Sequence, residues 1–237
     1  MGRFPNIAAA KAKTGAAKGK LYGMYAKEIY QVAKTGGVTP EGNPALKRLI
    51  EKAKKEQVPN DVIRRAIDKV NSGASESYEN ARYELFGPGG STLIVDCLTD
   101  NVNRTVSDIR TVVNKCHVKM GAMNSVSYMY DNLCIVGFKG LSLEEAMDAL
   151  INNGVDITDM EEENGMVIIY GNPTDLNAIK EAVLSAKEVS FDIDEIAMLP
   201  KDKIKLAGED LETFNKLLSM LDEVDDTNRV YHNVELG

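Results

Sequence analysis

The segment LCIVGFKGLSLEEAMDALINNGVDITDMEEENGMVIIY, residues 133–170, decides the fold class. It opens with a short apolar run, and Ser142-Leu143-Glu144-Glu145 then has the spacing of a helix capping box. Two further runs flank Glu163-Asn164-Gly165, and Asn-Gly is the turn pair most typical of a β-hairpin. The segment therefore predicts a strand, a helix and a hairpin, in that order.

The residues that follow complete this unit. Thr174 or Asp175 is placed to cap a helix that runs to about Ala186, and residues 191–198 have the composition of a strand. The order β-α-β-β-α-β over residues 133–200 is that of the split βαβ, ferredoxin-like unit. The strands expected in it lie at residues 133–138, 155–160, 166–170 and 191–198.

The flanking residues predict a second α+β sandwich. Before the central unit we expect a strand, a strand, a helix and a strand, at residues 83–86, 92–98, 101–115 and 125–130. After it come only a helix at 208–224 and a strand at 230–234. Since this tail cannot form a domain alone, we expect it to complete the sandwich begun before the central unit, which would then be an insertion.

The first part of the chain predicts helices alone. One should run from Leu21 to Lys34, a second from Pro44 with Asn43 as its N-cap, and a third from a cap at Asn60 or Asp61. The expected fold is α+β with three domains. Their predicted ranges are a basic helical domain at 1–77, a discontinuous α+β domain at 78–131 plus 205–237, and an inserted α+β domain at 132–204.

Charge is distributed unevenly along the 237 residues. The whole chain has a formal net charge of −8, but residues 1–78 carry +8 and residues 79–237 carry −16. The first 27 residues contain no acid. Runs of charge are often only solvated faces, but a basic module joined to an acidic body favours a polyanion as the partner of the basic end. We therefore expect nucleic acid to bind there, and we expect the acidic body either to contact a protein partner or to restrict where the basic module can lie.

The residues expected to contact phosphate are basic, and all but one lie in the first domain. They are Arg3, Lys11, Lys13, Lys18, Lys20, Lys27, Lys47, Arg48, Lys54, Lys55, Arg64, Arg65 and Arg104. Arg104 stands in the first turn of a helix, where its charge opposes the helix dipole, so a local role is also expected. Tyr22, Tyr25 and Tyr30 could stack on bases, although helical spacing places Tyr25 in the core. The sequence predicts no recognition helix with base-reading side chains.

Catalytic and metal chemistry lack support in the sequence. The two histidines and the three cysteines give neither a nucleophile–base pair nor metal-ligand spacing, so we expect no enzyme, catalytic residue, metal or cofactor. Gly87-Pro88-Gly89-Gly90 lacks the Gly-Lys-Ser/Thr of a P-loop and is interpreted as a turn that needs positive φ. The alternative is a glycine-lined edge that approaches a nucleic-acid backbone closely. Glu161–Glu163 and Asp225-Asp226 are interpreted as solvated turns.

The compartment expected from the sequence is the cytoplasm. No stretch approaches the roughly 18 consecutive apolar residues of a membrane span, and the N-terminus has no apolar signal-peptide core. The cysteine count is odd and the cysteines are scattered, which suits a reducing compartment.

Several ordered motifs resemble the YebC/PmpR family, and the early residues resemble its YeeN-like branch. They are Tyr83–Gly90, Leu98–Thr105, Asn43–Leu46, Val58–Asp61 and Val230–Val234. The resemblance implies three domains, a helical N-terminus and no enzymatic activity. It implies a probable DNA-binding transcriptional regulator in the cytoplasm. Because mitochondrial relatives are translational activators and some bacterial members are linked to the ribosome, a translation factor that binds ribosomal RNA is the alternative.

The sequence departs from the family pattern in two regions. Phe4-Pro5 replaces an aromatic-basic pair near the N-terminus, so we expect the strength of binding by this arm to differ from that in the family. His117-Val118 and Asn124 stand where the family has glycines, in a loop after the helix of the middle domain. We expect this loop to differ in behaviour if it needs glycine conformations.

Overall fold

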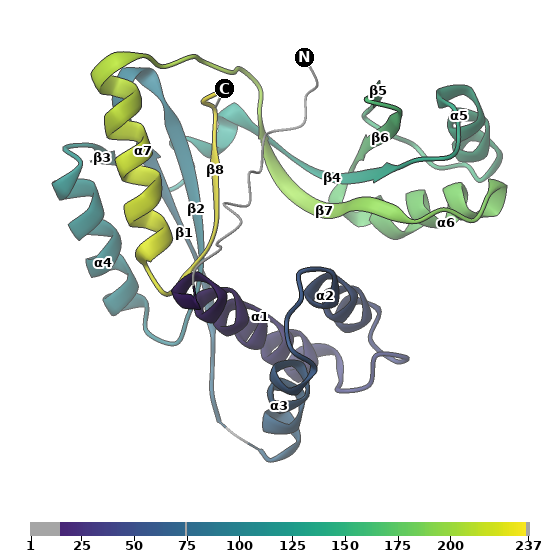
Figure 1. Cartoon of the computed structure of the whole chain (residues 1–237), viewed down its shortest axis with the longest axis horizontal. Helices are drawn as coiled ribbons and strands as arrows, with labels where there is room; N and C mark the ends of the chain where they lie inside the picture. Colours follow the sequence, from purple (N-terminus) through teal and green to yellow (C-terminus); the bar gives the residue numbers. More distant parts are fainter. Residues whose placement is uncertain (1–14, 74, 236–237) are drawn as a thin grey trace. The chain divides into compact units, whose positions relative to one another are not determined.

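The computed structural model describes residues 15–73 and 75–235 (Figure 1). The fold is α+β, as predicted: a helical N-terminal region is followed by helices packed on two four-stranded sheets. The described residues divide into two compact units, the first of residues 15–125 (residue 74 apart) with 206–230 and the second of 126–205 with 231–235. The helical region and most of the first sheet share one unit, so the predicted division into three domains stays a prediction.

Three helices with a common core form the N-terminal region. They are α1 (Gly15–Gly36), α2 (Pro44–Lys55) and α3 (Asn60–Asn71). Their shared core contains Tyr25, Ile29, Leu46 and Ile63, and its buried members all come from residues 25–66. The spacing of these apolar residues at three and four positions gives each helix one buried face.

The two caps predicted in this region have different outcomes. Asn43 caps α2 as predicted, because its Oδ1 accepts a hydrogen bond from the Leu46 backbone N–H at 3.1 Å. The prediction of Asn60 or Asp61 as the cap of α3 is wrong, since Pro59 takes the cap position and no side chain caps the helix there. Pro59 is extended, with φ −59° and ψ 139°, so Asn60 already has helical geometry.

The first sheet has the strand order β3-β1-β2-β8. Its elements are β1 (Glu79–Phe86), β2 (Thr92–Thr99), α4 (Val102–Lys115), β3 (Lys119–Met120), α7 (Gly208–Glu223) and β8 (Thr227–His232). Figure 1 shows α4 and α7 side by side on one face of this sheet. The last strand thus joins strands more than a hundred residues earlier, as expected for the C-terminal tail.

The turn between β1 and β2 has the conformation expected from its glycines. Gly89 and Gly90 have φ values of +59° and +81°. A Cβ on Gly89 would also lie 2.6 Å from Leu206 Cδ2, so this position needs glycine for space as well as for conformation.

The strand predicted at residues 125–130 is wrong. The third strand of the first sheet is the short β3, and residues 127–129 form a 3-10 turn instead. The chain leaves the sheet edge after β3, where the Gly121 N–H donates to Glu84 O at 2.7 Å and the Asn124 N–H to Glu84 Oε1 at 2.9 Å. Asn124 has a φ of +64°, and this left-handed residue interrupts extended structure.

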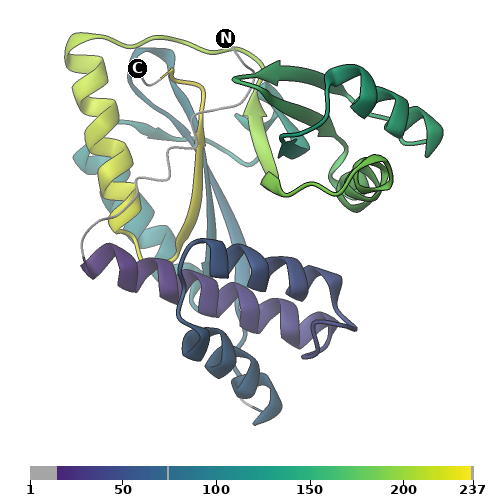
Figure 2. The ribbon, with the colours of Figure 1, turned by 45° about the vertical axis from the view of Figure 1, so that its right-hand side comes forward.

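The second sheet has the order β5-β6-β4-β7 and the chain order β-α-β-β-α-β that the sequence predicts (Figure 2). Its elements are β4 (Tyr130–Phe138), α5 (Leu143–Asn152), β5 (Asp159–Glu163), β6 (Met166–Gly171), α6 (Leu176–Ala186) and β7 (Phe191–Pro200). The capping box of Ser142 and Glu145 is confirmed. The strand expected at 155–160 begins later, at Asp159, because Val155 and Ile157 pack against the core ahead of it.

Candidate nucleic-acid interface

Helices α2 and α3 present the exposed cations of the N-terminal region. Each helix turns its apolar residues inward, so its basic residues lie on the remaining faces. Those exposed are Lys47, Lys54, Lys55, Arg64 and Arg65, while Arg48 is half-buried. Arg65 also forms an exposed ion pair with Asp61 at 2.7 Å, of a kind that contributes at most about 1 kcal/mol. These side chains remain accessible to a polyanion.

Asn43 fixes how α2 follows α1. Besides capping α2, its buried side chain donates from Nδ2 to Val32 O at 3.1 Å and to Gly37 O at 2.9 Å. A Cβ on Gly36 would lie 2.7 Å from that Nδ2. The amide therefore satisfies backbone groups at the end of one helix and the start of the next, and orients the basic face of α2 relative to α1.

Three of the cations expected to contact phosphate form ion pairs within the protein instead. Lys20 lies 3.3 Å from Asp222 Oδ1 at the end of α7. Lys27 Nζ and Arg104 Nη2 each lie 2.7 Å from a carboxylate oxygen of Asp226. The local role expected for Arg104 is thus an ion pair, which extends to Asp100 at 2.8 Å.

Asp226 is buried, so its interpretation as a solvated turn residue is wrong, whereas Asp225 beside it is exposed. The Asp226 side chain is 2% exposed. In addition to the two cations, the hydroxyls of Thr99 and Thr105 hydrogen-bond its Oδ2 at 3.0 and 2.9 Å. Burial raises the pKa of this carboxyl, but these four donors outweigh burial and hold its pKa well below the usual range.

The motif Leu98–Thr105 supplies most of this arrangement. Asn101 caps α4 by accepting from the Arg104 N–H at 3.0 Å, and the Asn101 N–H donates to Thr99 Oγ1 at 2.9 Å. The Leu98 N–H donates to the Asp226 carbonyl. Sequence reasoning singled out this motif but missed its acidic partner, because Asp226 lies 121 residues after Thr105 and only the fold brings them together.

The remaining residues predicted to contact nucleic acid divide into three groups. Arg3, Lys11 and Lys13 lie outside the described residues. Lys18 is exposed on α1. Tyr25 and Tyr30 are 1% and 2% exposed, so the prediction that these rings stack on bases is wrong. Tyr22 is half-buried against the helical core.

The cysteines lie in environments that disfavour the thiolate form. All three cysteines are buried and free, and burial raises the pKa of Cys97 and Cys134 to about 11, which keeps these thiols protonated at neutral pH. Among the described residues no cluster of three or more His, Cys, Asp or Glu side chains is arranged to hold a metal ion.

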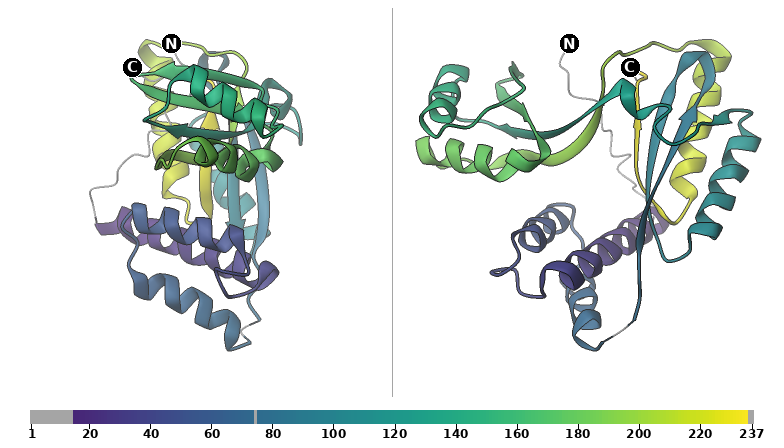
Figure 3. Two further views of the ribbon diagram at one scale, coloured as in Figure 1. Left: turned by 90° about the vertical axis from the view of Figure 1, so that its right-hand side faces the viewer. Right: turned by 180° about the vertical axis from the view of Figure 1, so that it is seen from behind.

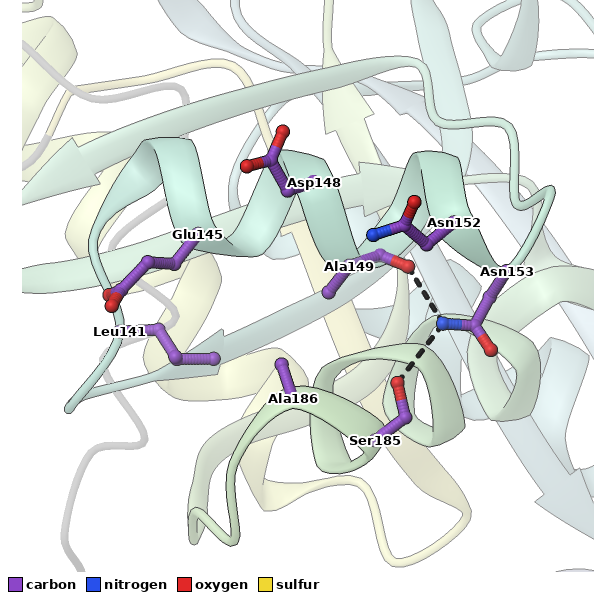
Figure 4. Close-up of a pocket in the computed structure, with 8 residues that line it drawn as sticks. All are labelled: Leu141, Glu145, Asp148, Ala149, Asn152, Asn153, Ser185 and Ala186. Atoms are coloured by element: carbon purple, nitrogen blue, oxygen red, sulfur yellow. Dashed lines mark hydrogen bonds between the residues drawn. The ribbon is translucent and has the colours of Figure 1, made fainter.

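A hollow of about 320 Å³ lies between α5 and α6, and its lining offers few groups that could bind a ligand (Figure 4). Its lining includes two acids and no cation. Asn153 Nδ2 spans it by donating to Ser185 Oγ at 3.0 Å and to Ala149 O at 2.8 Å, and Glu145 is occupied in the capping box. It is therefore a poor site for a phosphate or a nucleotide. Of the helices in residues 15–73 and 75–235, none is long and apolar enough to cross a membrane.

Together, the helical region with exposed cations and the two sheets with their helices define an α+β protein of a known class. Residues 2–73 match the model of the TACO1/YebC protein N-terminal domain, and residues 78–234 match that of the TACO1/YebC second and third domain. The chain therefore belongs to the YebC family, as its motifs indicated.

Curated relatives are similar over their whole length. A protein of Marinomonas sp. is 46% identical over 237 residues, covering 99% of this chain and all of its own. One of Vibrio parahaemolyticus is 47% identical over 238 residues, covering all of both chains. Both are named probable transcriptional regulatory proteins. The crystal structure of a conserved hypothetical protein from Aquifex aeolicus is similar with a TM-score of 0.77 and 33% identity, over 94% of this chain and 93% of that one. These names support a regulatory role.

Proposed function

We propose that the protein is a non-enzymatic, DNA-binding transcriptional regulator that contacts phosphates through exposed cations of α2 and α3. The observation that carries the proposal is the distribution of charge on these helices. Five exposed Lys and Arg side chains lie outside the buried faces of these helices, namely Lys47, Lys54, Lys55, Arg64 and Arg65. Such cations displace counterions from a phosphate backbone, which drives association without reading sequence.

Two further features support this surface over the other cations. Lys20 pairs with Asp222, and Lys27 and Arg104 pair with the buried Asp226, whereas the pair that Arg65 makes with Asp61 is exposed on both sides. The rest of the chain is acidic, with a net charge of −16 over residues 79–237, and would repel a polyanion. A nucleic acid is therefore attracted to the helical region alone.

The proposal is tested by fluorescence anisotropy of the full chain with a labelled DNA duplex at several salt concentrations. Wild type should lose affinity steeply with salt, and Lys54→Glu with Arg64→Glu should weaken binding and reduce the slope of log Kd against log salt by about 1 per lost contact. Lys119→Glu with Lys139→Glu, the same total change in charge at two exposed positions outside the helical region, is the matched control. Equal losses in the control and in the double variant would contradict the proposal.

The nature of the nucleic acid needs a second measurement. Native protein is sedimented from lysate with and without ribonuclease, at low and moderate salt. Migration free of ribosomes, together with competition by unlabelled DNA in the anisotropy assay, is the expected result. Co-migration with ribosomes that ribonuclease abolishes, with RNA outcompeting DNA, would overturn DNA binding in favour of ribosomal RNA.

A further inference from the structure

The junction between α1 and the first sheet is centred on Asp226. This residue lies in the turn between α7 and β8, and its carboxylate accepts from Lys27 of α1, Thr99 of β2, and Arg104 and Thr105 of α4. Lys27 Nζ also lies 3.5 Å from the Leu98 carbonyl. One buried carboxylate thus joins a helix of the N-terminal region to two elements of the sheet layer. We call this set of four side chains around Asp226 the clasp.

Further polar contacts extend the junction on both sides of the clasp. Toward the start of α1, Lys20 pairs with Asp222. Toward its end, Asn228 Nδ2 donates to Glu28 Oε1 at 3.0 Å, and Tyr30 Oη donates to the Glu76 carbonyl at 3.0 Å. Contacts of this kind depend on direction and charge, so they fix an orientation more than they contribute burial.

The helical region has its own core, which the clasp does not enter. The buried members of that core all come from residues 25–66, and the hydrophobic residues packed against it from residues 21–70. A change at the clasp therefore alters how the helical region is held, while the helices keep their mutual packing.

The consequence for α2 and α3 follows from where the elements lie. Figures 1 and 3 show α4 and α7 on one side of the first sheet, with α2 and α3 projecting toward the other. Helix α7 carries further exposed acids besides Asp222, namely Glu209, Asp210, Glu212 and Glu223. With α1 held by the clasp, these acids stay on the side away from the exposed cations.

We propose that Asp226 is a positioning residue for nucleic-acid binding: it holds α1 on the first sheet, so that α2 and α3 present their cations in one orientation with the acids of α7 kept away. This inference rests on the function proposed above. If the clasp is released, the helical region must be ordered when DNA binds, which makes the free energy of binding less favourable. The acids of α7 can then also approach the phosphates.

Asp226→Asn should change DNA affinity in the direction opposite to the one that its change in charge alone would give. Asp226→Asn removes a negative charge and frees two cations, which alone would strengthen binding. We expect it instead to weaken DNA binding about three- to tenfold, since lost preorganisation outweighs one charge. Asp225→Asn makes the same charge change at the adjacent exposed position and should leave the affinity unchanged or slightly higher.

The experiment measures orientation as well as affinity, in the full chain. Affinity is measured by anisotropy with the DNA duplex, and folding by far-ultraviolet circular dichroism. A glutamyl endopeptidase reports the junction by cleaving after Glu76, whose carbonyl accepts from Tyr30 and Lys34 of α1. Asp226→Asn should be cleaved there faster than wild type and Asp225→Asn at the wild-type rate. Global destabilisation alone would spread cleavage over other glutamates.

A milder variant keeps the test decisive if Asp226→Asn does not fold. Thr105→Val preserves shape and every charge but removes one hydrogen bond to the carboxylate. Thr105→Val should weaken DNA binding and speed cleavage after Glu76, each by a smaller factor than Asp226→Asn. Unchanged or stronger DNA binding by folded clasp variants, or unchanged cleavage after Glu76, overturns the proposal. Failure of wild type to bind DNA would instead overturn the proposed function and with it the positioning role, while cleavage would still report on the clasp itself.

Discussion

At the scale of single residues, two adjacent aspartates have opposite environments. Asp225 is exposed, whereas Asp226 is 2% exposed and accepts from two cations and two hydroxyls. A buried carboxylate is tolerated only with such compensation, because desolvation of an unpaired charge costs several kcal/mol. Asp226 is therefore a structural residue whose removal leaves its donors without an acceptor.

Asp226→Asn should lower the free energy of unfolding by about 2–4 kcal/mol at pH 7, less than for a fully buried pair because Arg104 is 47% exposed. The folded-state pKa of Asp226 is depressed below an unfolded value of about 3.9, so its stabilisation is present above that value and is lost as pH falls through the folded pKa. Urea titrations from pH 7 to pH 2 measure the free energy of unfolding. The difference in this free energy between wild type and Asp226→Asn should narrow only in acid. Asp225→Asn should show no such difference.

His117 occupies a conformation that favours glycine. Its φ is +54°, in the left-handed region, and its side chain is exposed. His117→Gly should raise the free energy of unfolding by about 0.5–1 kcal/mol, because glycine avoids the left-handed penalty of a Cβ. His117→Ala keeps the Cβ and should give no comparable gain. Equal effects of both variants in thermal unfolding would show that the strain is relieved elsewhere.

At the scale of elements, side-chain caps and apolar spacing explain which parts of the sequence were predictable. The capping box at Ser142 and the cap at Asn43 are local signals, and both are confirmed. The prediction of a strand at 125–130 was wrong. The alternation of apolar and polar residues does not reveal the hydrogen bonds to Glu84 that turn the chain away from the sheet. Local propensity is overridden where a tertiary contact competes with it.

Asn43→Ala should destabilise the helical region by about 2–3 kcal/mol, because it removes the α2 cap and leaves the carbonyls of Val32 and Gly37 without their amide donor. Asn60→Ala is the matched control: Asn60 is exposed, begins α3 and makes no cap, so its change should stay within about 0.5 kcal/mol. Chemical denaturation followed by circular dichroism measures both. A large effect at Asn60 would contradict the cap assignment.

At the scale of the whole molecule, the chain forms two units with separate interiors. The core of the second unit draws its buried residues from 134–191, within one continuous stretch of sequence. Charge asymmetry allowed the basic end to be identified from the sequence. It could not show which cations are neutralised, because Asp222 and Asp226 lie about two hundred residues from Lys20 and Lys27.

Ile179→Ala should destabilise the second unit by about 2–5 kcal/mol without altering DNA affinity. Ile179 is fully buried on α6 and fills the space left by Gly171, where a Cβ would lie 2.6 Å from its Cδ1. Hydrogen exchange should accelerate in residues 126–205 and stay unchanged in α1 to α3. Faster exchange throughout the chain would indicate that the two units unfold together.

The position of β8 beside β2 has a consequence for the order of folding during synthesis. Helices α1 to α3 and the second sheet each contain only local or contiguous segments, so they can form as soon as those segments leave the ribosome. The first sheet cannot close until residues 227–232, which form β8, have emerged from the ribosome. Until then β2 keeps an open edge and Lys27 has no Asp226, so the nascent chain passes through a stage in which its basic end is free and its middle sheet unfinished.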